Sequence, residues 1–133
     1  MIMALFSRIG YTYLPTSNID EAIEWYVNQL GFTLKSPKFN DGVGVVAVLS
    51  LPDGYSVVLL VETNNETNAA FSRNGKPFQT LALNCPDLPY THEMLKNNGV
   101  DVSEIIVRSE EAKYFIIKDP DGNLIEAAWS VWD

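Results

Sequence analysis

Between residues 9 and 16 the chain alternates in the way that a half-buried β-strand does. Tyr11 and Tyr13 occupy one set of alternate positions, and Thr12 and Leu14 occupy the other. The period then changes, and apolar side chains recur three and four residues apart at Ile19, Ala22, Ile23, Tyr26, Val27 and Leu30. The pattern predicts a strand followed by a helix.

Both ends of this helix carry capping signals. Asn18 precedes the first apolar position and stands three residues before Glu21, which is the spacing of a capping box. Gly31 follows the last apolar position, where a glycine readily adopts the left-handed conformation that ends a helix.

Three strand-like stretches come next, at 32–36, 43–51 and 55–62. An Asn-Asp-Gly turn precedes the second stretch, and a Pro-Asp-Gly turn precedes the third.

The same order of elements recurs 68 or 69 residues later. Gly31 corresponds to Gly99, and the Pro-Asp-Gly turn at 52–54 corresponds to a second one at 120–122. The second copy contains a helix from Asp87 to Gly99 and strands at 78–84, 100–107, 113–118 and 123–131. We therefore predict a single α+β domain of two tandem βαβββ modules, at about 9–63 and 77–131, joined by a polar linker at 64–76.

Two segments resemble a known family. "LPTSNIDEAIEWYVNQLGF" at 14–32 and "DPDGNLIEAAW" at 119–129 are similar to the vicinal oxygen chelate superfamily, which includes glyoxalase I, bleomycin resistance proteins and extradiol dioxygenases. The resemblance implies curved mixed sheets around a cavity, and it implies a homodimer. It also implies that a divalent metal, where one is bound, takes its ligands from Tyr11, Val58, Thr80 and Glu126.

Glu126 is the residue of greatest chemical interest. Side chains alternate along a strand, so Glu126 shares one face with Leu124 and Ala128, whereas Ile125, Ala127 and Trp129 form a bulkier face suited to the helix. Glu126 is then expected to face the cavity, where a buried carboxylate needs a cation, a hydrogen-bond donor or a raised pKa. Either it accepts a hydrogen bond from a ligand, or it is structural and bonded to Tyr11 or Thr80.

A metal centre is not expected at this position. Among the four positions implied by the resemblance, only Glu126 is an ordinary metal ligand, whereas a catalytic metal usually takes about three protein ligands. Glu62 lies on the strand face of Val58 and is the one partial substitute. The only histidine, His92, is expected at the edge of the second helix, outside the cavity. The predicted cavity residues are Tyr11, Tyr13, Glu62, Thr80 and Glu126, with Leu60 and Ala82 beside them.

Charge and composition narrow the partners. Nine Lys and Arg against seventeen Asp and Glu give a net charge of −8, which disfavours nucleic acids and anionic membranes and mildly favours neutral or cationic ligands. The single Cys85 reads as a buried thiol, and the N-terminus resembles neither a secretion signal nor a membrane span. We expect a cytoplasmic protein.

Three functions are consistent with these observations. The leading hypothesis is a metal-free protein that binds and sequesters a small molecule, aromatic or cationic in character. The second is a lyase, isomerase or dioxygenase that depends on a divalent metal held around Glu126. The third is an interaction module with a vestigial pocket. The sequence leaves open whether the protein is an enzyme.

Overall fold

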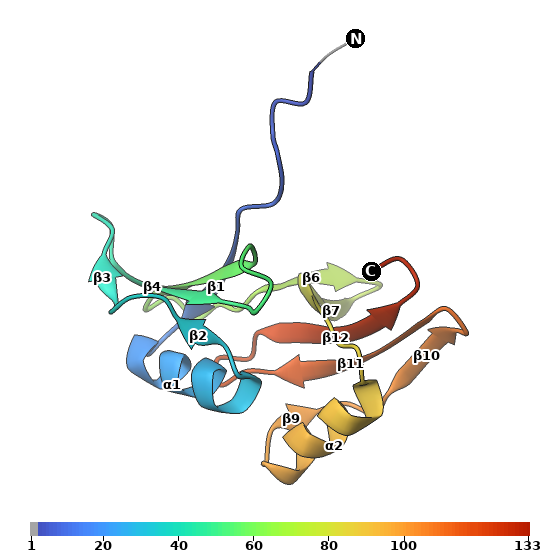
Figure 1. Cartoon of the computed structure of the whole chain (residues 1–133). Coiled ribbons are helices and arrows are strands. Elements are labelled where there is room, and N and C mark those ends of the chain that lie inside the picture. Colours follow the sequence, from blue (N-terminus) through green and yellow to red (C-terminus); the bar gives the residue numbers. More distant parts are fainter. Residues whose placement is uncertain (1–2) are drawn as a thin grey trace.

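Each half of the chain folds into a mixed β-sheet with one α-helix against one of its faces (Figure 1). The computed structural model describes residues 3–133. The first half contains β1(Tyr11–Thr16), α1(Ile19–Leu30), β2(Thr33–Leu34), β3(Phe39–Asn40), β4(Val45–Ser50) and β5(Val57–Glu62). The second contains β8(Leu81–Asn84), α2(Leu88–Asn97), β9(Asp101–Val102), β10(Ile106–Ser109), β11(Ala112–Lys118) and β12(Leu124–Ser130). The prediction of two similar α+β halves is confirmed.

The two sheets have matching topology. Their strand orders are β1-β5-β4-β2 and β10-β11-β12-β8, with β3 paired to β4 and β9 paired to β11. In each sheet the first strand of the half pairs in parallel with the last, β1 with β5 and β8 with β12, and the other pairs are antiparallel. Consequently β1 and β8 are the edge strands of their sheets.

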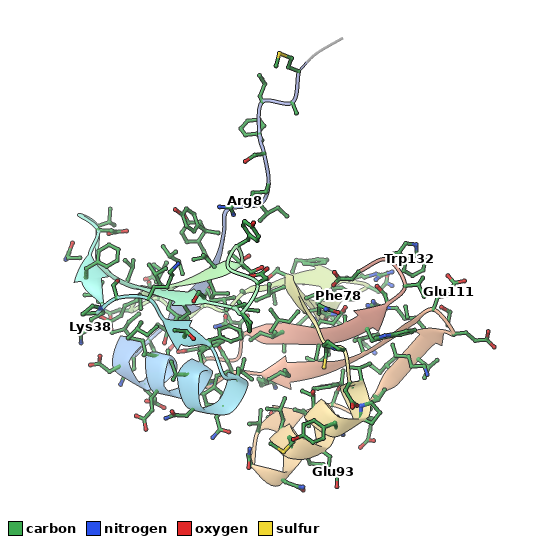
Figure 2. All side chains as sticks on the ribbon, in the orientation of Figure 1. Arg8, Lys38, Phe78, Glu93, Glu111 and Trp132 are labelled. Carbon is green, nitrogen blue, oxygen red and sulfur yellow. The ribbon has the colours of Figure 1, made fainter. Side chains whose placement is uncertain are left out.

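The segment expected to be a linker contains a β-hairpin. Strands β6(Ala70–Arg73) and β7(Lys76–Gln79) pair through a turn in which Asn74 and Gly75 have φ angles of 53° and 77°. An Asn-Gly pair favours such a turn because both residues tolerate positive φ. Phe71 and Phe78 pack across the strands with their ring centroids 5.2 Å apart. In Figure 2, Phe78 lies on the opposite side of the second sheet from Glu93 of α2.

One hydrophobic core is shared by both halves. It includes Leu14 and Leu60 from the first sheet and Phe115 and Ile125 from the second, all fully buried, together with residues of both helices. Ile125 and Ala127 belong to this core and Trp129 packs against it, which confirms the predicted face assignment for β12. The opposite face of β12 is therefore free to form a site.

The turn at 119–123 attaches the second half to the first. The Tyr26 hydroxyl donates to Asp119 Oδ2 at 2.6 Å, and Asn123 Nδ2 donates to the Pro15 carbonyl at 2.9 Å. Both the backbone N–H and the hydroxyl of Ser17 donate to Asp121 Oδ1, each at 2.8 Å. The polar side chains of this turn thus form the contact between the halves. No helix within residues 3–133 has the length and apolarity needed to cross a membrane.

Candidate ligand-binding site

Glu126 lies on the face of the second sheet that points away from α2. The residue is only 6% exposed, and its Oε1 accepts hydrogen bonds from Gln79 Nε2 at 2.5 Å and from Arg108 at 3.1 Å. The Arg108 guanidinium also lies over the Tyr114 ring, with 3.9 Å between its Cζ and the ring centroid. These contacts provide the donors and the positive charge that a buried carboxylate requires.

Four different strands bring these side chains together. Glu126 is paired with Ile116 of β11 and Ala82 of β8, so all three share one face of the sheet. Tyr114 lies two residues before Ile116 and faces the same way. Arg108 lies two residues after Ile106, the strand partner of Tyr114, and so faces the same way, next to a register shift between Val107 and Ser109. Gln79 arrives from the end of β7.

The two protein donors leave one carboxylate oxygen of Glu126 without a protein partner. Gln79 and Arg108 both bind Oε1, and no donor within residues 3–133 forms a hydrogen bond with Oε2. Since no buried side-chain oxygen or nitrogen among these residues lacks a partner, Oε2 is accessible from outside. It can therefore accept a hydrogen bond from a bound molecule.

A cavity of about 740 Å³ lies between the edge strands β1 and β8, and the residues of this cluster are not part of its lining. Its lining includes Tyr11, Ser56, Val57, Leu81, Ala82 and Asn84. Ala82 is the neighbour of Glu126 in the sheet, so the cavity ends one strand away from the carboxylate. A volume of this size is within the range of small-molecule pockets.

The family model of the Glyoxalase/Bleomycin resistance protein/Dioxygenase superfamily matches residues 8–127. The chain belongs to this superfamily. The resemblance recognised in the sequence is thereby confirmed, and the match extends over both βαβββ halves.

Solved structures with the same fold include several members of the superfamily. An antibiotic binding protein from Streptomyces sp. CB03234 is 20% identical, with a TM-score of 0.74 over 94% of this chain and 97% of its own. A glyoxalase family protein from Enterococcus faecalis is 19% identical, with a TM-score of 0.75 over 94% and 99%. A superfamily member from Sphaerobacter thermophilus DSM 20745 is 18% identical, with a TM-score of 0.72 over 94% and 98%. No curated protein matches the chain.

The residues at the site do not fit the divalent metal that some superfamily members bind. Within residues 3–133 no group of three or more His, Cys, Asp or Glu side chains is placed to hold a metal ion. Val58 is in the core, and the cation that contacts Glu126 is the Arg108 guanidinium. A metal site needs further negative or neutral donors at that place.

The structure places the predicted residues of β5 away from Glu126. The side chains of Val58 and Leu60 are 2% and 0% exposed and belong to the core. Glu62, on the same strand face, accepts a hydrogen bond from Ile19 N at 2.9 Å and so lies at the start of α1. Val58 is also among the residues that line the cavity, but it belongs to the core and not to the cluster around Glu126.

A difference of one residue between the two halves explains this placement. Glu126 pairs with Ala82, and the residue that pairs in the same way with Tyr13 is Leu59, not Val58. Strand β5 starts three residues after Gly54, whereas β12 starts two residues after Gly122. A shift of one residue turns a side chain to the other face of the sheet.

The other predicted residues have different outcomes. Tyr11 lines the cavity, and Tyr13 lies near it, with the two rings 6.4 Å apart and both residues about 60% exposed. Thr80 is exposed beside Gln79, and neither Thr80 nor Tyr11 is the partner of Glu126. Their roles in binding stay predictions. His92 binds the Ser103 carbonyl at 2.8 Å and packs edge-on to Phe115, on the helix side, as expected.

Proposed function

We propose that this chain is a metal-free member of the superfamily that binds and sequesters a small molecule. The observation that carries the proposal is a cavity of about 740 Å³ between β1 and β8, whose lining residue Ala82 is the strand partner of the buried carboxylate Glu126. A carboxylate held by Gln79 and Arg108 is fixed in place before a ligand arrives, which lowers the entropic cost of binding. The Streptomyces antibiotic binding protein of the same fold lends support.

The walls of the cavity suit a ligand with an aromatic or apolar body. Tyr11 exposes 59% of its surface beside the cavity, and Val57 and Leu81 add apolar surface to the lining. Pockets for small organic molecules combine such walls with a few polar groups that fix orientation. The ligand would lie between β1 and β8 and extend toward Glu126.

We further propose that two copies form a homodimer in the cytoplasm, as expected from the sequence. The open face of the first sheet exposes aromatic side chains, with Tyr13 at 61% and Phe39 at 46%. Exposed aromatic side chains are typical of interfaces between proteins. Light scattering coupled to size-exclusion chromatography tests this part, and a strictly monomeric protein at high concentration would contradict it.

A thermal-shift screen with aromatic and heteroaromatic compounds tests the proposed function. Ligands that bind the native state raise its melting temperature. The Ala82→Trp variant fills the cavity, so we expect it to lose the stabilisation, whereas Lys113→Trp, on the opposite face of the same sheet, should retain it. Equal responses of the two variants would place binding elsewhere.

Metal analysis of the purified protein provides an independent test. We expect no divalent metal in stoichiometric amounts, and we expect the same ligand affinity with and without a chelator. Near-stoichiometric zinc, nickel, manganese or iron that is lost in a Glu126→Gln variant would instead support a metal-dependent enzyme.

A further inference from the structure

Glu126 is not the charge that a ligand meets first. In the Glu126–Arg108 pair, the side chain of Arg108 is 44% exposed and that of Glu126 only 8%. The chain has a net charge of −8, which on its own suggests a cationic ligand. At this site, however, the accessible charge is positive.

Arg108 is held in one orientation by two contacts. One terminal nitrogen donates to Glu126 Oε1, and the Tyr114 ring covers one face of the guanidinium. A guanidinium has five N–H donors in one plane, so most of its donors remain for a ligand. Its uncovered face is also able to stack on a further planar group.

The in-plane N–H donors and the uncovered face of the Arg108 guanidinium together specify the chemistry of the ligand. The in-plane donors of a guanidinium match a carboxylate, which can accept two parallel hydrogen bonds. Arg108 itself does not line the cavity between β1 and β8, so the ring of the ligand must extend from that group across Glu126 to Ala82, where the cavity begins. Glu126 accepts from Arg108 and is itself held by Gln79, so Glu126 orients the guanidinium directly and Gln79 does so through Glu126.

We propose that Arg108 is the main ligand-recognising residue and that the ligand is a planar aromatic anion, such as an aromatic carboxylate. The inference rests on the function proposed above and replaces the cationic ligand that the net charge suggests. Glu126 and Gln79 are positioning residues in this scheme, and the Tyr114 ring packs against one face of the guanidinium.

Three probes of matched size separate charge from shape: 2-naphthoate, 2-naphthamide and 2-naphthylmethylammonium. We expect wild-type protein to bind the carboxylate about tenfold more tightly than the other two, since a charge-assisted hydrogen bond is stronger than a neutral one. Isothermal titration calorimetry measures the three affinities, and added salt should weaken the binding of the carboxylate but not that of the neutral amide.

Variants test whether the preference for the carboxylate depends on Arg108. Arg108→Gln should reduce the affinity for 2-naphthoate to that for 2-naphthamide, whereas Lys113→Gln, which removes the same charge from the opposite face, should leave the preference intact. Arg108→Lys keeps the charge but lacks the planar fork, so an intermediate affinity is expected. If Arg108→Gln alone fails to fold, the double variant Arg108→Gln/Glu126→Gln removes both charges and should show the same loss.

The outcomes distinguish the two proposals. Equal binding of all three probes by wild-type protein, or tighter binding of the ammonium, would overturn the role of Arg108 while leaving the pocket in place. A carboxylate preference that survives Arg108→Gln would also overturn it. If wild-type protein binds none of the three probes, the proposed binding function itself is contradicted, and this inference with it.

Discussion

Asp119 is a carboxylate that is almost completely enclosed where the two halves meet. It is 5% exposed and accepts four hydrogen bonds, from the Tyr26 hydroxyl, the Asn123 side chain and the backbone N–H groups of Asp121 and Asn123. Burial raises the pKa of Asp119, and the hydrogen bonds act in the opposite direction. Burial, and then the charge of Asp119, raises the pKa of Tyr26, so its hydroxyl remains a donor.

Replacing Tyr26 by Phe tests the importance of this contact. The substitution keeps the ring that packs on Trp25 and Phe32 but removes one of the four donors to Asp119. We expect the free energy of unfolding to fall by about 1–3 kcal/mol, as is usual for a buried hydrogen bond to a charged group. Urea denaturation measures the change.

Tyr90→Phe is the matched control for this substitution. Tyr90 is 62% exposed on α2, so the loss of its hydroxyl should change the free energy of unfolding by less than about 0.5 kcal/mol. Equal effects of the two substitutions would show that the Tyr26–Asp119 contact contributes nothing specific.

At the same scale, Glu126 shows what a single strand pattern can and cannot reveal. Its orientation followed from alternation along β12, because the bulkier side chains of Ile125 and Trp129 had to face the helix. Its partners could not be found in this way. Arg108 lies just beyond the strand predicted at 100–107, and Gln79 fell within the strand predicted at 78–84, whereas in the structure it ends the hairpin strand β7.

At the scale of elements, two turns with the same three residues have different functions. Asp53 accepts hydrogen bonds from Tyr55 and Ser56 of its own turn, whereas Asp121 accepts them from Ser17 in the other half. The extra residue before β5 then changes which side chains face the cavity. The offset between the two halves locates their strands and helices well. One additional residue in a loop, however, decides on which face of the strand a given side chain lies.

The position of Glu62 leads to a prediction about α1. Its carboxylate accepts from Ile19 N at the first turn, where the helix dipole and unpaired N–H groups favour a negative charge. Glu62→Gln should lower the free energy of unfolding by about 0.5–1 kcal/mol without changing ligand affinity. Chemical denaturation and the calorimetry described above measure both quantities.

Glu66→Gln provides the control. This substitution removes the same charge, but Glu66 is exposed in the loop after β5. It should leave stability unchanged. A loss of ligand affinity in Glu62→Gln, with stability retained, would restore the original assignment of Glu62 to the cavity.

At the scale of the whole molecule, the duplicated pattern made the fold predictable from sequence. Each half repeats a strand, a capped helix and further strands, and such consistency between local signals and topology is what specifies a fold. The arrangement of the site was less accessible, because it depends on contacts between elements distant in sequence. Gln79 and Glu126 are 47 residues apart, and Ser17 and Asp121 are 104 apart.

Contact between the halves should also depend on pH through Asp121. Burial alone would raise the pKa of this carboxyl, but hydrogen bonds from Thr16 and from the backbone and hydroxyl of Ser17 outweigh burial and lower the pKa below 3.8. A carboxyl with a lowered pKa in the folded state contributes stability above its unfolded pKa. That contribution is lost as the pH falls through the folded value.

Comparison of wild type with Asp121→Asn isolates this contribution, because Asp119 and its opposite shift are present in both proteins. We expect wild type to be more stable than Asp121→Asn at about pH 7, and the difference to shrink below about pH 4 as Asp121 is protonated. Urea denaturation at a series of pH values measures the two curves. A constant difference across that range would mean that Asp121 acts through its shape alone, and that its charge does not help to hold the two halves together.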